Sequence, residues 1–330
     1  MIDHLLVIGF GGPPRPEDVQ PFLKIVTEGA AIPPARLAEV EHHYQITGGF
    51  SPYNEHTVRL VEKMRVRLRE DGVTLPMFLG MRNWHPFLHE TMREIAAQRL
   101  TRGLGIILAP HRCEASYEQY LQNVEDAKVQ ASAPQLSYAY LRAWHDHPLF
   151  IQAQADEVRK TLERIPASER DAVPLVFSAH SIPVEMAQHS QYEAEYRLSC
   201  ELVARQLRHS AWSLAYQSRS GNPKQPWLEP DVEFVLNRLQ AQGVRRALLV
   251  PIGFLSDHTE VLYDLDVDAK HEAQRLGLEY LRASTVMDHP AFVAMFSQLI
   301  SEAFLRVPPT RVGGYSRGTP PSRRTHVGSG

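Results

Sequence analysis

The sequence predicts an α/β protein in which parallel strands alternate with helices. Short apolar runs bounded by Gly or Pro recur at residues 5–10, 76–80, 105–110, 173–183 and 247–250. Such runs are typical of strands that are buried on both faces of a parallel sheet. The 330 residues are enough for two domains with sizeable cores.

Helices are expected between these strands. The first begins near residue 17, and Pro33 and Pro34 open a second over residues 35–44. Further helices are expected to end near residue 69, to follow residue 86, and to cover 148–165 and 290–306. Residues 129–144 are rich in Ser, Ala, Pro and Gln, which indicates a crossing between domains.

Composition and charge exclude several classes of function. The net charge of −3 and the lack of a basic run give no reason to expect a nucleic-acid partner. The first residues lack the basic region of a signal peptide, and no apolar stretch reaches the roughly 20 residues that span a membrane. Cys113 and Cys200 fit neither a disulfide framework nor a zinc ribbon. We therefore expect a cytoplasmic location and leave peripheral membrane contact open.

The first strand leads into a glycine-rich turn, GFGGPP at residues 9–14. The turn resembles the start of a dinucleotide fingerprint, but Pro14 stands where the third glycine should be. No acidic ribose-binding residue is evident on a second strand either. We expect a tight strand-to-helix turn that brings the backbone close to some ligand.

Histidines and a carboxylate follow the predicted strands at their carboxyl ends. His111, His180, His258 and Glu260 all come after apolar runs. A lone histidine in such a place is more often structural than catalytic, but ligands of open parallel sheets bind beyond these strand ends. We therefore predict that the four residues converge on one site.

Two further patterns have both a functional and an ordinary interpretation. Arg82 and Trp84 offer a cation and a flat aromatic face to a planar acidic ligand, or form a surface pair. In a helix that begins near residue 259, Glu260, Asp264 and Asp268 would advance by about 40° per step and share one face. Like charges four apart destabilise a helix, so the ladder either meets a cation or is a solvated acidic face.

Three blocks of sequence resemble the signature blocks of the ferrochelatase family, whose members insert ferrous iron into a porphyrin. The blocks are FSAHSIP at 177–183, AYQSRSGNPKQPWLEP at 215–230 and PIGFLSDHTEVLYDLDVD at 251–268. LLVIGFGGPPRPEDVQPFL and GMRNWHPF also fit the family, and the motif order is kept to about residue 306. IPPARLAEVEHHYQITGGFSP and the RNWHP block resemble the actinobacterial-like branch, which favours coproporphyrin III over protoporphyrin IX as the substrate.

The resemblance implies a fold and a domain division. The family fold has two similar Rossmann-like α/β domains, each a parallel sheet flanked by helices, with the active cleft between them. We expect the domains at residues 1–145 and 146–306, with the last helix able to pack back on the first domain. Residues 307–330, rich in Pro, Gly, Ser, Thr and Arg, are expected to form a disordered tail.

The resemblance also implies roles for the site residues. His180 matches the histidine that takes up pyrrole protons or contacts the metal, and Glu260 matches the carboxylate that faces it across the cleft. Asp264 and Asp268 match an acidic relay that leads metal inward. The implied porphyrin-binding positions are Arg82, Trp84, Trp227 and His258.

These residue types suit the chemistry of metal insertion. A free-base porphyrin must lose two N–H protons, and an imidazole can accept protons near neutral pH. The ring must also be distorted before an out-of-plane metal can bind, which a shaped pocket can impose. Nitrogen and carboxylate ligands suit Fe²⁺ without the tight grip of several thiolates.

The chain departs from parts of the family pattern. Some members hold a [2Fe–2S] cluster with four cysteines, whereas this chain has two in all, so we predict no cluster and no tightly bound cofactor. Fe²⁺ is expected as a substrate. Pro14 occupies the place of a tyrosine that approaches the metal in some coproporphyrin chelatases. Cys113 could take that role, but a small buried residue is the better interpretation.

Three classes of function are consistent with these patterns. The first is an iron-inserting porphyrin chelatase, and the second is a non-catalytic tetrapyrrole- or metal-binding paralogue on the same scaffold. The third is a metal-dependent hydrolase, which needs three protein ligands around one metal and an open position. The first class predicts that His180 and Glu260 face each other across a gap wide enough for a tetrapyrrole.

Overall fold

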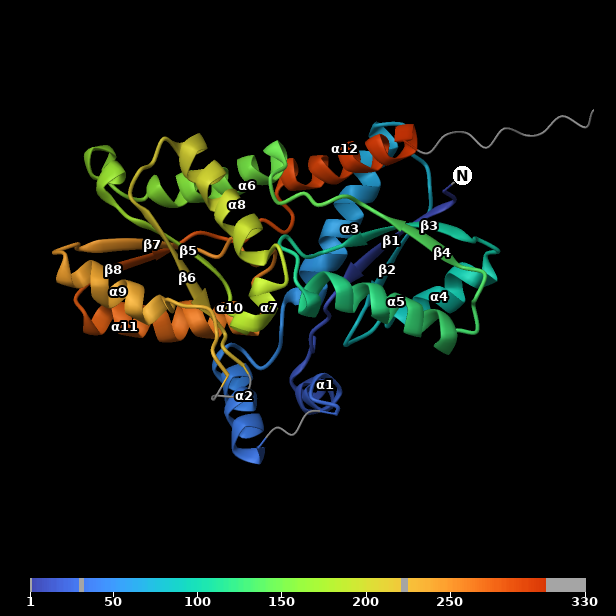
Figure 1. Ribbon diagram of the computed structural model, residues 1–330, viewed down its shortest axis with the longest axis horizontal. Coiled ribbons are helices and arrows are strands. Elements are labelled where there is room, and N and C mark those ends of the chain that lie inside the picture. Colours follow the sequence, from blue (N-terminus) through green and yellow to red (C-terminus); the bar gives the residue numbers. More distant parts are fainter. Residues whose placement is uncertain (1, 30–32, 221–224, 307–330) are drawn as a thin grey trace, which may run out of the picture.

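The computed structural model describes residues 2–29, 33–220 and 225–306, which form two parallel four-stranded sheets (Figure 1). The sheet of the N-terminal half has the order β2-β1-β3-β4, and that of the C-terminal half has the order β6-β5-β7-β8. The strands are β1 (His4–Gly9), β2 (Met77–Met81), β3 (Arg102–Ile107), β4 (Ser137–Tyr140), β5 (Leu175–His180), β6 (Trp212–Gln217), β7 (Arg246–Val250) and β8 (Glu279–Arg282). Both halves thus order their strands alike, which confirms the predicted fold class.

Helices connect consecutive strands in both halves. The N-terminal half contains η1 (Pro16–Asp18), α1 (Val19–Val26), α2 (Pro34–Ile46), α3 (Tyr53–Glu70), α4 (Leu88–Ala97), the π-helix η2 (Glu114–Glu118) and α5 (Gln119–Gln130). The C-terminal half contains α6 (Pro148–Leu162), η3 (Ala167–Ala172), α7 (Val184–Gln188), α8 (Tyr192–Leu207), α9 (Val232–Ala241), α10 (Thr259–Val261), the π-helix η4 (Leu262–Ala269), α11 (Lys270–Arg275) and α12 (Pro290–Arg306).

Each sheet is covered on both faces, which explains why its central strands are continuously apolar. Successive side chains of a strand point to opposite faces. Leu5 and Val7 of β1 therefore enter the core under α3, whereas Leu6 and Ile8 pack against α4 and α5. In the C-terminal half, α6 and α8 cover one face of the sheet and α9, η4 and α11 cover the other.

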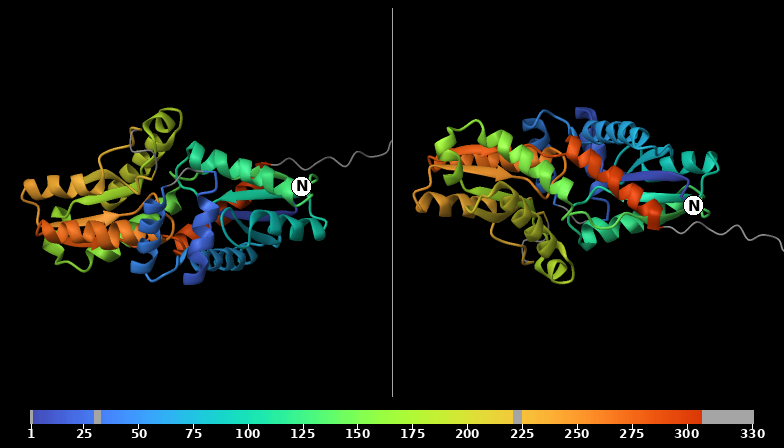
Figure 2. Two further views of the ribbon diagram at one scale, coloured as in Figure 1. Left: turned by 90° about the horizontal axis from the view of Figure 1, so that it is seen from below. Right: turned by 90° about the horizontal axis from the view of Figure 1, so that it is seen from above.

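One hydrophobic core joins the two halves. It contains residues of α3, α6, α8 and α12 together with one face of each sheet. The helix α12 crosses from the C-terminal half to the N-terminal half and packs against both α6 and α3 (Figure 2). The domain boundary at residue 145 stays a prediction.

We expect Phe292→Ala to destabilise the protein by about 3–5 kcal/mol. Phe292 is fully buried in α12, with its ring centroid 5.6 Å from Trp144 and 6.0 Å from Phe150. Truncation would leave a cavity where the halves share their core. Urea unfolding measures the change, and Phe234→Ala is the control because Phe234 is 60% exposed. A loss below about 1 kcal/mol for Phe292→Ala would contradict the shared core.

Several predicted elements need correction. The stretch at 129–144 is not a plain crossing, because it contains β4, and Trp144 is buried in the shared core. The strands β4, β6 and β8 were not predicted, because each is only partly buried and lacks a continuous apolar run. The predicted tail at 307–330 lies outside the described residues. Among the helices of the described part, none is long and apolar enough to cross a bilayer.

Candidate functional site

The segment after β7 is positioned by a cap and by a contact from β8. The side chain of His258 caps α10, where Nδ1 accepts a hydrogen bond of 3.2 Å from the Glu260 backbone N–H. A helix therefore begins at Thr259, as predicted. This helix continues as the π-helix η4 rather than as an α-helix. The carbonyl of Leu265, a residue of η4, accepts a hydrogen bond of 2.6 Å from the Tyr280 hydroxyl.

His180 and Glu260 meet at the same edge of the C-terminal sheet. His180 ends β5 and Glu260 follows β7, and these strands are hydrogen-bonded neighbours. The His180 Nε2 atom lies 4.0 Å from Glu260 Oε2. The prediction that they face each other across a tetrapyrrole-wide gap is therefore wrong, because adjacent strands bring the two residues side by side. A macrocycle could lie against the pair, but not between its members.

The tautomer of His180 follows from its second ring nitrogen. Nδ1 lies 2.5 Å from the carbonyl oxygen of Ser181, which can only accept a hydrogen bond. In the neutral imidazole, Nδ1 therefore carries the proton and Nε2 presents a lone pair towards Glu260. The side chains are 31% and 51% exposed, respectively, so a ligand from solvent can reach both. A nitrogen lone pair beside a carboxylate can accept a proton or bind a divalent metal ion.

Aromatic residues lie beside His180 and the capping residue His258. The Phe254 ring centroid lies 5.3 Å from that of His258 and 6.5 Å from that of His180. Tyr53 of the N-terminal half lies 6.4 Å from His258, and its hydroxyl accepts a hydrogen bond from the Phe10 backbone. Burial lowers the pKa of His258, which favours its neutral form as a cap. Sequence reasoning missed Phe254, although it lies within the third signature block.

His111 does not join the predicted site. Its side chain is buried, and Nε2 lies 3.1 Å from Ser199 Oγ of α8. Burial lowers the pKa of His111 to about 3, so it stays neutral. Cys113 is also buried, and burial raises the pKa of its thiol, which agrees with a small core residue.

Asp264 and Asp268 of the acidic ladder lie on η4, next to α2 of the N-terminal half, whereas Glu260 lies on α10. The Asp264 carboxylate is half-buried and accepts hydrogen bonds from Ser218 and, at 3.3 Å, from Gln217. Asp268 is exposed. Tyr263 of η4 stacks on His43 of α2, with ring centroids 3.5 Å apart and planes 9° apart. Asp264 is therefore a partnered carboxylate rather than part of a solvated face.

We expect Asp264→Asn to stabilise the protein at neutral pH only. Burial, opposed by the Ser218 hydrogen bond, raises the pKa of Asp264 to about 6 from 3.8. The folded protein binds the carboxyl proton of Asp264 more tightly than the unfolded chain does. Protonated Asp264 therefore contributes its full stabilisation of the fold below about pH 4, and this contribution is lost as the pH rises through about 6. The variant should gain about 2 kcal/mol at pH 7 and nothing near pH 4 in urea unfolding. An equal difference at both pH values would contradict the raised pKa.

The predicted porphyrin-binding residues lie on both halves. The Arg82 backbone N–H donates to the Gly9 carbonyl at 3.0 Å, which places Arg82 beside the first loop. Trp84 is buried against Phe22, so its ring does not form an open platform. Trp227 is also buried and pairs with Pro183, just after His180. Their roles in porphyrin binding stay predictions.

The first loop makes the tight turn that the sequence predicts. Gly11 has a φ of +86°, and a Cβ there would lie 2.9 Å from the Trp84 backbone nitrogen. A residue with a side chain would therefore be both strained and crowded. The Gly12 backbone N–H donates to the Asn54 side chain at 2.8 Å, which ties the loop to α3.

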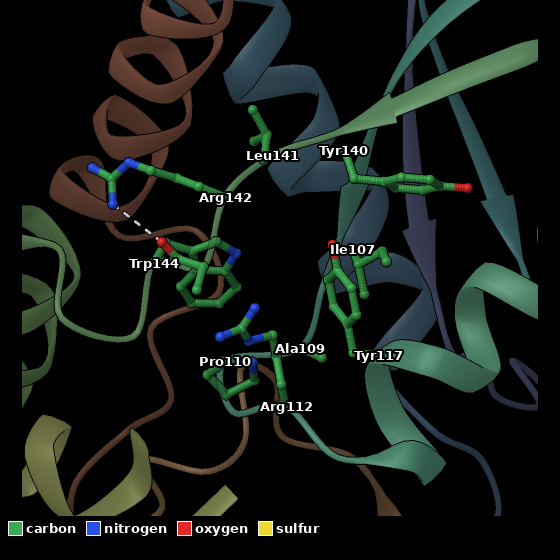
Figure 3. A pocket seen from close by; sticks show the side chains of 10 residues that line it. Ile107, Ala109, Pro110, Arg112, Tyr117, Tyr140, Leu141, Arg142 and Trp144 are labelled. Carbon is green, nitrogen blue, oxygen red and sulfur yellow. Dashed lines mark hydrogen bonds between the residues drawn. The ribbon is translucent and has the colours of Figure 1, made fainter. Parts of the chain in front are cut away.

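Two cavities elsewhere contain none of the predicted site residues. One of about 10 Å³ lies between Arg112, Tyr117 and Trp144, and it has room for one water molecule at most (Figure 3). The other, of about 460 Å³, lies between the end of α3 and β2. Within the described ranges, no group of three or more His, Cys, Asp or Glu side chains is arranged to hold a metal ion.

Comparison with known structures supports the same fold. SirB from Bacillus subtilis with Fe³⁺ superimposes with a TM-score of 0.56 at 11% identity, covering 92% of this chain and 95% of SirB. The sirohydrochlorin chelatase SirB from Bacillus subtilis subspecies spizizenii in complex with cobalt gives a TM-score of 0.52 at 10% identity, with the same coverage. At these identities the likeness concerns the fold alone.

Sequence comparison identifies the family. A family model described as ferrochelatase matches residues 3–304. The coproporphyrin III ferrochelatase of Nocardia farcinica is 40% identical, covering 94% of this chain and 91% of that protein. The ferrochelatase of Rhodopirellula baltica is 39% identical, covering 91% and 86%. The coproporphyrin III ferrochelatase of Streptomyces coelicolor is 38% identical, covering 91% and 85%. The chain therefore belongs to the ferrochelatase family of lyases, which insert iron into a porphyrin.

Proposed function

We propose that this protein inserts Fe²⁺ into coproporphyrin III in haem biosynthesis, and that His180 and Glu260 act together in that step. The observation that carries the proposal is the 4.0 Å approach of His180 Nε2 to Glu260 Oε2. Two relatives of 40% and 38% identity are coproporphyrin III ferrochelatases by name, which supports the choice of porphyrin. The family match also favours a chelatase over a metal-dependent hydrolase.

The side-by-side arrangement defines how the pair would work. Both side chains approach a macrocycle from one face, so one imidazole nitrogen and one carboxylate address the same metal ion or the same pyrrole protons. Two donors of this kind bind Fe²⁺ weakly enough to release it to the four ring nitrogens. His180 Nε2 then accepts one pyrrole proton, the adjacent Glu260 carboxylate stabilises the resulting imidazolium, and the second pyrrole proton passes to the solvent that reaches the exposed pair.

Residues near the first loop supply the contacts for the porphyrin carboxylates in this proposal. A guanidinium such as that of Arg82 binds carboxylates strongly and with defined geometry. Coproporphyrin III carries four propionates where protoporphyrin IX carries two. Additional charged hydrogen bonds are therefore available to the former, and they would favour its binding.

The proposal includes a cellular setting and a set of partners. It places the reaction in the cytoplasm and leaves peripheral membrane contact open. The ligands that the proposal assigns to the protein are porphyrin and ferrous iron, and no nucleic-acid partner is proposed. The sequence contains two cysteines, so a cluster held by four thiolates of this chain is not part of the proposal.

An anaerobic insertion assay tests the proposal. Purified protein receives Fe²⁺ with coproporphyrin III or with protoporphyrin IX, and the Soret band is followed against controls without enzyme. We expect kcat/KM to be at least about tenfold higher for coproporphyrin III, which corresponds to one additional charged hydrogen bond. Equal values, or a preference for protoporphyrin IX, would overturn the substrate. No enzyme-dependent rate with either porphyrin would overturn the function and favour a non-catalytic paralogue.

A further inference from the structure

Arg282 joins two carboxylates at the edge of the C-terminal sheet. It is the last residue of β8, and its side chain is only 15% exposed. Nη1 donates to Asp257 Oδ1 at 3.0 Å, while Nε and Nη2 donate to the two oxygens of Asp266 at 2.6 and 2.8 Å. Paired hydrogen bonds from a guanidinium to a carboxylate are strong and fix the relative orientation of both groups.

The two carboxylates flank the site segment. Asp257 directly precedes the capping residue His258, and Asp266 lies within η4, so Glu260 stands between the two points that Arg282 holds. Tyr280 of the same strand holds η4 at a further point, through its hydrogen bond to the Leu265 carbonyl. The edge strand β8 therefore fixes the backbone on both sides of Glu260.

Glu260 depends on that backbone for its position. Among residues 2–29, 33–220 and 225–306, its carboxylate makes no side-chain hydrogen bond, and its approach to His180 is 4.0 Å. The distance between the Glu260 carboxylate and the His180 imidazole is thus set by the backbone of residues 257–266 rather than by a direct hydrogen bond. Loss of the guanidinium would leave Asp257 and Asp266 as half-buried carboxylates without the cation that compensates their charges.

We infer that Arg282 is a positioning residue for the reaction, which holds Glu260 at the correct distance from His180. The inference rests on the proposed roles of His180 and Glu260. Residues that orient metal-binding groups typically change metal affinity or activity by about 10–100-fold when they are replaced. Arg282→Gln should therefore raise the KM for Fe²⁺ by about 10–100-fold, and it should leave the KM for porphyrin within about threefold of the original value.

Arg246 provides a matched control on the same pair of strands. It begins β7 at the opposite end from the site, and its guanidinium also joins two carboxylates, Glu169 at 2.8 Å and Glu279 at 2.5 Å. Its side chain is 20% exposed. Arg246→Gln therefore removes a comparable ion-pair network without touching the site segment, and it reports the effect of lost stability alone.

The experiment compares wild-type protein with the Arg282→Gln, Arg282→Lys, Asp266→Asn and Arg246→Gln variants. Fe²⁺ and porphyrin KM values, kcat and Tm are measured for each. Lysine keeps the charge but cannot replace the bidentate fork, so Arg282→Lys should fall between wild type and Arg282→Gln. Asp266→Asn should raise the KM for Fe²⁺ in the same direction, and it tests the inference even if Arg282→Gln does not fold.

The outcomes separate the inference from the proposed function. A higher KM for Fe²⁺ in the Arg282 and Asp266 variants, with Arg246→Gln unchanged, supports the positioning role. An unchanged KM for Fe²⁺ in these variants, or the same change in Arg246→Gln at equal loss of Tm, overturns it. Absence of iron insertion by the wild-type protein refutes the proposed function instead.

Discussion

His180→Ala is expected to lower kcat for iron insertion by about 10³-fold while the fold is retained. A correctly positioned general base typically accelerates the chemical step by about 10²–10⁴-fold. The His180 Nδ1–H is already held by the Ser181 carbonyl, so Nε2 is the nitrogen that this change removes. The side chain is 31% exposed, so its loss creates no closed cavity. The hydrogen bond from Tyr192 ends on the backbone carbonyl of residue 180 and survives the substitution.

His189→Ala is the matched control for this prediction. His189 is exposed, and its Nδ1 contacts a backbone carbonyl within α7, on the segment that follows β5. Steady-state insertion rates and Tm values are compared for both variants. Turnover by His180→Ala within tenfold of the wild type would remove His180 from the proposed mechanism.

Glu260→Gln is expected to lower kcat/KM for Fe²⁺ by about 10²-fold. Glutamine keeps the size and one oxygen of the side chain but lacks the negative charge. The loss should appear mainly in the KM for Fe²⁺, because the neutral amide is a weaker ligand for a hard divalent cation. The side chain is 51% exposed and caps no helix, so Tm should change little.

Glu62→Gln controls for the removal of one negative charge. Glu62 is an exposed residue of α3, away from the site segment. Both variants are assayed at several Fe²⁺ concentrations under anaerobic conditions. An unchanged KM for Fe²⁺ in Glu260→Gln would exclude the carboxylate as a metal contact.

The sequence predicts those parts of the fold that depend on complete burial. The strands β1, β5 and β7 are covered on both faces, so their sequences are apolar runs. The bounds that these runs predict lie within a few residues of the observed strand bounds. The edge strands β4 and β8, with the sequences SYAY and EYLR, are short and half-buried. Their pairing depends on the neighbouring strand rather than on their own composition, and a local pattern could not show it.

The geometry of the candidate site could not be predicted from the sequence, and the roles of its residues stay predictions. His180 ends β5 and Glu260 follows β7, strands that are far apart in the sequence, and only the sheet order shows that they are neighbours. His111 follows a strand in the same way, yet α8 covers it. Arg282 lies outside the signature blocks, so its contact with Asp257 and Asp266 needed the folded chain.

A double-mutant cycle tests the central claim that His180 and Glu260 act as one unit. Iron insertion into coproporphyrin III is measured anaerobically for the wild type, His180→Ala, Glu260→Gln and the double variant. Because the reacting atoms of the pair lie 4.0 Å apart, the account predicts that the double variant is within about threefold of the slower single variant. Losses in kcat/KM that multiply, as for two independent residues, would contradict it.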